Sequence, residues 1–471
     1  MKLTWFSEYA ARPGELVEWV LHPATLDAAT EAPQDLRPPS YMQEGHMRTA
    51  ALLHDLDVDA PTWIGTAFDI EGALDRASLE AALLKWFDRH ETLRSGLRST
   101  QQALERFTLS SAAVKLQRGA VRHFSDGADV VAHLEARFDE ATNPLTWPPY
   151  VIVTVAREHD FTVYLAFDHS NVDGYSIVLL PHEIHELYAA ARDERPARLG
   201  EANSYVDFSQ IERQRADTVQ AEDESVVRWR GFIESGDGRL PCFPLDLGVG
   251  SGELPAQTGV CEWLLDPSDA NAFNLACKRH GGNFLAGILA TASIVAHERG
   301  GEPTYRTVIP FHTRSDARWA ASLGWYIGLA PIEIATYQAR DFRELVGMAR
   351  DAVRAARPIS QVPLARVWSL LGVALAPKFV VSYMDGRMVP GAGQWQDWRA
   401  HAFGKVSYGD EVYMWVNRAV SGLYVTSRYP STDVADKNIM GYIDGTRDVL
   451  LAVARSGGYA LSHHLPAKAA G

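Results

Sequence analysis

Cysteine is scarce in this chain of 471 residues, and its scarcity excludes several classes of protein. The three cysteines, Cys242, Cys261 and Cys277, form an odd set without paired metal-binding spacing. A disulfide framework needs more cysteines in a shorter chain, so we expect a reducing compartment, the cytoplasm. Hydrophobic residues make up 46% and charged residues 22%, values typical of an ordinary globular protein and not of a disordered one.

Long apolar runs are missing as well. The longest, residues 284–296, is too short to cross a bilayer and is interrupted by hydroxyl side chains. The N-terminal residues carry Glu8, Glu15 and Glu18, a pattern unlike that of a signal peptide. We therefore expect no membrane span.

Positive charge is in deficit. Lys and Arg together number 45 against 59 Asp and Glu, which gives a net charge of −14. Such a balance disfavours nucleic acid or an anionic membrane as the main partner. A ligand that carries phosphate needs only a local basic patch and is not excluded.

Strand and helix patterns occur in both halves of the chain. In the first half they predict a strand at 62–70, an amphipathic helix at 78–90 with Ser78 as its N-cap, strands at 150–155 and 161–167, and a helix at 175–192. In the second half they predict strands at 260–265, 305–311, 325–334, 379–383, 411–417 and 422–427, and helices at 268–280, 283–298, 342–357 and 433–454.

A charged tract rich in Pro and Gly at its end separates the two halves. We expect an N-terminal domain at 1–200, a crossover or linker at 201–258 and a C-terminal domain at 259–471. Since both periodicities occur in each half, the fold class is α/β, built as α+β two-layer sandwiches.

The strongest chemical signal is the run 168–174, DHSNVDG, where a hydrophobic strand ends and a helix begins. His169 has an ordinary pKa of about 6.5, which suits proton transfer near neutrality. We expect Asp173 to pin the loop by pairing elsewhere, and Gly174 to let the chain turn closely into the helix. By itself the pattern also fits a structural histidine cap.

A second segment, RHETLR at 89–94, favours a functional interpretation of His169 over a structural cap. Together the two segments resemble the condensation-domain superfamily of acyltransferases, which includes chloramphenicol acetyltransferase and nonribosomal-peptide condensation domains. The family's H-H-x-x-x-D-G corresponds to residues 168–174, and its R-H-E-x-L-R is intact. The chain is most similar to the free-standing polyketide-associated acyltransferases over nearly its whole length, and further matching stretches are 38–41, 243–248, 323–332, 381–387 and 414–418.

The resemblance implies two chloramphenicol-acetyltransferase-like subdomains that form a V-shaped pseudo-dimer with a tunnel between them. The chain departs from the family at Asp168, which replaces the first His of the doublet. Because the family's base is the second His, the resemblance still implies that His169 is the catalytic base. Asp168 leaves open the hydrogen bonding around that base.

Supporting roles also follow from the resemblance. Asp173 is expected to be structural and paired with Arg94, with Arg314 as a second candidate partner. The oxyanion donor stays open between backbone N–H groups near Gly174 and Ser407. We also take Arg314 and Trp325 as candidates for the oxyanion site or the substrate lining.

The implied function is acyl transfer from a carrier-protein or coenzyme A thioester to a hydroxyl or amine of a small molecule. No metal or organic cofactor is expected, since coenzyme A or phosphopantetheine enters as part of the substrate. The histidines in PHEIHELY, His182 and His185, lie three apart where a zinc-protease helix needs four. We expect a monomer.

Two alternatives stay open. One is a peptide-bond-forming condensation enzyme, which takes an amine acceptor and an aminoacyl donor. The other is a catalytically silent module of the same fold that docks a carrier protein or a partner enzyme. The presence of His169, Asp173 and Gly174 favours an active enzyme over the silent module. Because the 471 residues show no adenylation or carrier segment, we expect a stand-alone enzyme in natural-product or lipid biosynthesis.

Overall fold

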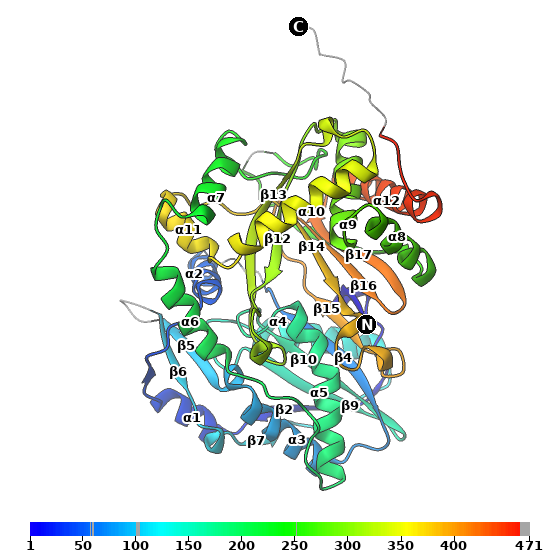
Figure 1. Ribbon diagram of the computed structural model, residues 1–471. Helices are drawn as coiled ribbons and strands as arrows, with labels where there is room; N and C mark the ends of the chain where they lie inside the picture. Colours follow the sequence, from blue (N-terminus) through cyan, green and yellow to red (C-terminus); the bar gives the residue numbers. More distant parts are fainter. Residues whose placement is uncertain (57, 59–60, 100–103, 251, 462–471) are drawn as a thin grey trace. The chain divides into compact units, whose positions relative to one another are not determined.

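The computed structural model describes residues 1–56, 58, 61–99, 104–250 and 252–461, and its contacts divide the chain into two compact units (Figure 1). Unit 1 comprises Met1–Thr218, His312–Ile327 and Met388–Lys405. Unit 2 comprises Val219–Phe311, Gly328–Arg387 and Val406–Gly471. Two short segments from the second half of the chain thus belong to unit 1. The predicted division at 1–200, 201–258 and 259–471 stays a prediction, and its middle part carries helices.

Unit 1 is a mixed α/β structure. Its strands are β1 (Lys2–Trp5), β2 (Gly14–Leu21), β3 (Gln34–Asp35), β4 (Ile64–Glu71), β5 (Ser95–Ser99), β6 (Leu104–Thr108), β7 (Leu116–Arg118), β8 (Arg122–Phe124), β9 (Tyr150–Ala156), β10 (Asp160–Phe167) and β15 (His401–Gly404). Its helices are α1 (Pro23–Glu31), α2 (Tyr41–Asp55), α3 (Arg76–Arg89), α4 (Gly127–Ala141), α5 (Gly174–Arg192) and α6 (Tyr205–Asp217).

The main sheet of unit 1 has the order β1-β15-β4-β10-β9-β2-β7, with β8 also paired to β2. Strand β10 lies between β4 and β9, antiparallel to both. Every residue of β10 after Asp160 is buried, because helices cover both faces of the sheet. On one face, Leu134 and Phe138 of α4 pack on Val151 and Val153 of β9. Helices α3 and α5 pack together against the sheet on the other face.

The helix predicted at 78–90 is α3, but its N-cap is Asp75 and not Ser78. The Asp75 side chain accepts hydrogen bonds from the backbone N–H groups of Ala77 and Ser78. An aspartate three residues earlier satisfies these free amides, so the helix begins sooner than its apolar stripe. The predicted strands at 62–70, 150–155 and 161–167 and the helix at 175–192 are confirmed as β4, β9, β10 and α5.

Unit 2 contains a six-stranded sheet in the order β11-β17-β16-β14-β12-β13. Its strands are β11 (Gln257–Leu265), β12 (Tyr305–His312), β13 (Ile327–Ile334), β14 (Phe379–Asp385), β16 (Val412–Ala419) and β17 (Gly422–Pro430). Its helices are α7 (Glu224–Glu234), α8 (Pro267–Arg279), α9 (Phe284–Gly300), α10 (Phe342–Ile359), α11 (Leu364–Leu371) and α12 (Asp433–Ser456). The apolar run 284–296 is the buried core helix α9, too short for a membrane span.

Short 3-10 turns connect several elements, and they are Phe6–Glu8, Glu91–Arg94, Ser111–Ala113, Ala317–Trp319, Thr336–Gln338, Gly386–Met388 and Ala392–Gln394. Within the described part of the chain, every helix is too short or too polar to cross a membrane.

Candidate active site

The loop that carries the motif leaves the centre of the unit 1 sheet. Strand β10 ends at Phe167, which pairs with Ile64 of β4 and Tyr150 of β9. At the next residue the backbone N–H of Asp168 donates to the carbonyl oxygen of Pro149 at 2.9 Å. The loop ends where the Asp173 side chain caps α5 by accepting from the backbone N–H of Ser176 at 2.7 Å. A rigid strand and a capped helix therefore hold this short loop at both ends.

His169 lies in this loop and keeps part of its surface open. Its ring lies on the indole of Trp325, with centroids 4.1 Å apart and planes tilted by 33°. The ring nitrogen Nδ1 is buried, and no other residue that the structure describes forms a hydrogen bond with it. The residue as a whole is only partly buried, so the other ring nitrogen, Nε2, is the candidate for contact with a substrate.

The surroundings of His169 favour the neutral imidazole. Desolvation of the ring, together with the positive charge of His46, lowers the pKa of His169 from 6.5 to about 4. A general base must be unprotonated before it can accept a proton. In this site His169 meets that condition across the neutral range.

Asp173 is held by Arg314, which was the second candidate partner in the sequence. Their side chains form a two-pronged ion pair, with Arg314 Nη1 to Asp173 Oδ2 at 2.6 Å and Arg314 Nη2 to Asp173 Oδ1 at 3.1 Å. The backbone N–H of Tyr326 also donates to Asp173 Oδ2, at 3.1 Å. Burial opposes the charged carboxylate, but the Arg314 guanidinium prevails and lowers the pKa of Asp173. Asp173 is thus a structural anion that ties the loop to residues 314–326.

The predicted pairing of Asp173 with Arg94 is wrong. The Arg94 guanidinium donates instead to the backbone carbonyls of Phe87 at 2.9 Å and Leu109 at 2.6 Å. These carbonyls lie at the end of α3 and after β6, where chain ends leave acceptors unpaired. Arg94 therefore closes local backbone structure and does not reach the motif loop.

The first two residues of the RHETLR segment serve a different carboxylate. Arg89 Nε donates to Glu183 Oε1 at 3.0 Å, and His90 Nε2 lies 2.8 Å from Glu183 Oε2. Glu183 belongs to α5, so this buried cluster fastens α3 to the helix that follows the motif. Sequence analysis missed this use of Glu183, because it considered the stretch PHEIHELY only for its histidine spacing.

The steric role predicted for Gly174 is not found. Gly174 is the first residue of α5, its φ is not in the left-handed region, and a Cβ there would meet no atom within 4 Å. The glycine that a close approach does require is Gly324, where a Cβ would lie 2.3 Å from the ring of Tyr205. The Ser176 amide of the first turn of α5 is already bonded to Asp173, and a role of other backbone N–H groups near Gly174 as oxyanion donors stays a prediction.

Asp168 replaces the family's first histidine, and its side chain pairs with a histidine from another part of unit 1. Its Oδ2 lies 2.8 Å from Nε2 of His46, a residue of α2, and its Oδ1 accepts from the backbone N–H of Ser170 at 2.8 Å. The sequence analysis missed His46. The only signal near it was the matching stretch 38–41, which directly precedes and begins α2.

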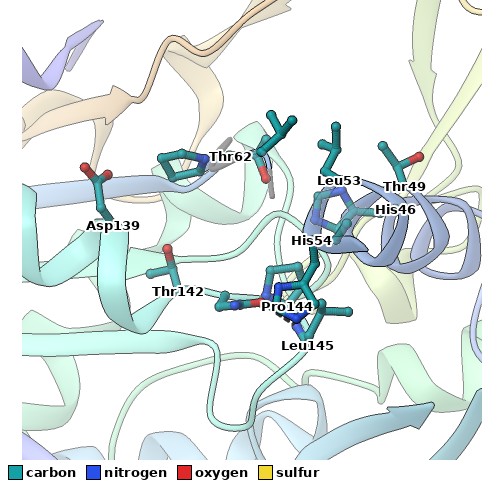
Figure 2. A pocket seen from close by; sticks show the side chains of 13 residues that line it. His46, Thr49, Leu53, His54, Thr62, Asp139, Thr142, Pro144 and Leu145 are labelled. Atoms are coloured by element: carbon teal, nitrogen blue, oxygen red, sulfur yellow. Dashed lines mark hydrogen bonds between the residues drawn. The ribbon is translucent and has the colours of Figure 1, made fainter. Parts of the chain in front are cut away.

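His46 borders a cavity of about 250 Å³ in unit 1. In Figure 2, His46 and His54 lie on the α2 side of this cavity, while Asp139 and Thr142 lie across from them. The remaining lining residues are Thr49, Ala50, Leu53, Val58, Pro61, Thr62, Asn143, Pro144 and Leu145. The cavity brings open space to the outer side of the pair formed by His46 and Asp168.

Ser407 belongs to unit 2, where its carbonyl oxygen accepts from the backbone N–H of Gln257 at 2.8 Å. Its role as an oxyanion donor therefore stays a prediction. Trp325 and Arg314 lie in unit 1 with the motif, where Trp325 contacts His169 and Arg314 pairs with Asp173.

Comparison with known proteins identifies the group to which this arrangement belongs. A family profile described as "Condensation domain" matches residues 34–377. The chain belongs to the condensation-domain family. The fold expected from the resemblance is thereby confirmed at the level of the family.

Curated relatives cover almost the whole chain. The chain is 26% identical to the 2'-acyl-2-O-sulfo-trehalose (hydroxy)phthioceranyltransferase PapA1 of Mycobacterium tuberculosis, over 97% of this chain and 89% of the relative. It is 27% identical to the trehalose-2-sulfate acyltransferase PapA2 of Mycobacterium bovis, over 96% of this chain and 97% of the relative. Like these stand-alone proteins, the chain is an acyltransferase.

Solved structures support the same fold. A structure of the PapA2 acyl transferase matches with a TM-score of 0.89 at 24% identity, over 96% of this chain and 100% of that one. The first condensation domain of the calcium-dependent antibiotic synthetase matches with a TM-score of 0.69 at 17% identity, over 90% and 97%. The mixed α/β fold of the condensation type is therefore confirmed.

Proposed function

We propose that this acyltransferase moves an acyl group from a thioester to a hydroxyl group of a sugar-like or lipid-like acceptor, with His169 as the general base. One observation carries the proposal: a partly exposed imidazole stands on a loop that a buried ion pair fixes, and the lowered pKa of His169 favours its neutral form. The names of the relatives support a hydroxyl acceptor, since PapA2 is a trehalose-2-sulfate acyltransferase and PapA1 acts on an acylated sulfo-trehalose. The pathway is lipid or natural-product biosynthesis.

The reaction follows from the geometry of His169. His169 Nε2 accepts the proton of the acceptor hydroxyl, while the oxygen of that hydroxyl attacks the thioester carbonyl carbon. The tetrahedral intermediate then collapses, the C–S bond breaks, and the imidazolium returns the proton to the leaving thiolate. Base catalysis of this kind contributes about 10²–10⁴-fold, and a backbone N–H group near Gly174 would stabilise the negative oxygen of the intermediate.

The donor is proposed to be an acyl carrier protein or an acyl-coenzyme A. In either case the phosphopantetheine arm arrives as part of the substrate, and proton transfer and positioning suffice for the chemistry. The reaction as written therefore uses no metal and no separate organic cofactor. We further propose that the enzyme acts in the cytoplasm as a monomer.

Intact-mass spectrometry and product analysis test the proposal. Purified protein is offered acyl-coenzyme A thioesters and acyl-loaded carrier proteins of several chain lengths, each with trehalose, trehalose-2-sulfate, a simple alcohol or an amine. The matched variants are His169→Ala and His159→Ala, because His159 lies exposed in the turn at the other end of β10. We expect an ester product that falls by about 10²-fold or more with His169→Ala and stays unchanged with His159→Ala.

Two results would overturn parts of the proposal. Equal product with wild type and His169→Ala would exclude His169 as the base. Product only with amine acceptors would replace ester formation by amide formation, as in a condensation enzyme. Tight carrier-protein binding without any product would instead favour the silent docking module.

A further inference from the structure

His46 and Asp168 form a buried pair directly beside the base. Their side chains keep only 15% and 1% of their surface exposed, and Nε2 of His46 lies 2.8 Å from Oδ2 of Asp168. The other oxygen of Asp168 accepts from the backbone N–H of Ser170 at 2.8 Å. The Asp168 carboxylate therefore connects the two chain neighbours of His169, Asp168 and Ser170, and His46 holds that carboxylate in place.

His46 also reaches the ring on which the base lies. The edge of its imidazole meets the face of Trp325, with centroids 5.5 Å apart and planes at 80°. Trp325 in turn lies against His169 at 4.1 Å. Thus His46 is connected to His169 by two separate routes, one through Asp168, the preceding residue in the chain, and one through the side chain of Trp325.

Helix α2 holds His46 firmly enough for this purpose. Ser40 and Gln43 form a capping box at its first turn. Gln43 Nε2 also donates to the carbonyl oxygen of Ser170 at 3.0 Å. The hydroxyl of Tyr205 lies 2.8 Å from Ser40 Oγ and 3.0 Å from the carbonyl oxygen of Trp325. The helix is thus tied to both segments that frame the base.

We propose that His46 is a positioning residue for acyl transfer, which acts through Asp168 and Trp325 to hold the ring of His169 in one orientation. The inference rests on the proposed role of His169 as the base. It explains why a chain that lacks the family's first histidine carries an aspartate there: the imidazole comes from α2, and the aspartate receives it.

The pair also sets the charge beside the base. Burial opposes a charged ring, but the Asp168 carboxylate raises the pKa of His46 and so favours its protonated form. That positive charge contributes, after desolvation, to the lowered pKa of His169. Other titratable or charged groups near His46 are His54 and Asp139, which border the same cavity, and Glu44, which pairs with Arg48 of α2 and Arg213 of α6.

The pH dependence of kcat/KM separates a positioning role from a merely structural one. In His46→Gln, which removes the charge but keeps a hydrogen-bond donor, we expect kcat to fall about 10-fold through lost orientation of the base. The acid limb of the kcat/KM profile should move to higher pH, because the positive charge beside His169 is gone. His46→Phe keeps a ring against Trp325 but leaves the buried Asp168 carboxylate without its partner, so it should show the same direction of pH shift with a larger loss of kcat.

His54→Gln is the matched control, because His54 lies on the same helix and borders the same cavity without contacting Asp168. It should leave both kcat and the acid limb unchanged. Asp168→Asn supplies the second test: combined with His46→Gln it should cost no more than the worse single variant, since the pair acts as one unit. Additive losses, or an acid limb that stays at its wild-type pH in both His46 variants, would overturn the proposal.

A titration of the wild-type protein with ¹⁵N-labelled histidine covers the case in which the variants do not fold. The signals of His169 should shift as His46 loses its proton, and signals of His169 that ignore that step would overturn the inference. This measurement needs no acyl transfer. A failure of the proposed function, in which no donor and acceptor give product, is therefore distinguishable from a failure of the coupling between His46 and His169.

Discussion

Two buried clusters in unit 1 have the same chemistry and different uses. In one, Glu183 holds Arg89 and His90; in the other, Asp173 holds Arg314 beside His169. The side chain of His90 is 1% exposed and its Nε2 is bonded to Glu183, whereas His169 is only partly buried. A carboxylate that pairs with the histidine itself, as Glu183 does with His90, uses that histidine to hold two helices together. A carboxylate that takes an arginine instead leaves the neighbouring histidine free to react.

The largest expected effect comes from breaking the second cluster. Arg314→Met leaves Asp173 buried without its cation, and loss of one partner of a buried pair costs about 3–5 kcal/mol. We expect that loss in the free energy of unfolding, measured by urea denaturation, with loss of acyl transfer because the motif loop is released. Arg94→Met should leave kcat near wild type, and a comparable loss of kcat would restore the pairing with Arg94.

Breaking the first cluster should affect stability and spare the chemistry. Glu183→Gln keeps the shape but removes the charge between Arg89 and His90, for which we expect a loss of about 1–3 kcal/mol in the free energy of unfolding. Steady-state kinetics at a temperature where the variant is folded should give an unchanged kcat. A variant of normal stability with a lowered kcat would place this cluster in the active site.

At acid pH the two clusters should affect different measurements: the His169 cluster should affect kcat/KM, and the Glu183 cluster should affect stability. The pKa of His169 is lowered to about 4, so the base is neutral above that pH, and kcat/KM should fall about tenfold per unit well below it. Burial raises the pKa of Glu183, but the ion pairs with His90 and Arg89 outweigh burial and lower that pKa. The stabilisation of the fold by charged Glu183 is therefore present above pH 4.5 and is lost as the pH falls through the lowered pKa. Tryptophan fluorescence follows that loss separately. An acid limb of kcat/KM near 6.5 would contradict the desolvated site.

The smallest expected effect concerns the aromatic neighbour of each histidine. Trp325 lies 4.1 Å from His169, whereas Trp86 meets His90 at 6.3 Å and 73°. Aromatic contacts contribute about 0.5–1.5 kcal/mol, so Trp325→Leu should lower kcat about 2- to 10-fold. Trp325→Phe keeps a ring and should stay near wild type in both kcat and thermal unfolding. Equal kcat for Leu and Phe would show that the stack does not orient the base.

Periodicity predicted most elements that lie in the cores. The strands β9 and β10 and the helices α3, α5, α9 and α10 follow from residue patterns that are local in the chain. Helices α1, α2, α4, α6, α7 and α11 were not predicted, and most of the stability of a helix comes from packing on other parts of its unit, which a local pattern does not show. One of these, α2, carries His46, so a residue of the candidate site was missed together with its helix.

From residue patterns alone, the chain predicts the family and a candidate base, His169, directly after a hydrophobic strand. Those predictions depend on residue types at short, fixed spacing, as in the run from Asp168 to Gly174. The pairing of Arg314 with Asp173 across 141 residues, and of His46 with Asp168 across 122, depends on tertiary packing. Any arginine or histidine in a chain is an equal candidate for a buried carboxylate. The fold chooses among them, because the interaction needs contact within about 3 Å, and only packing brings two distant residues that close.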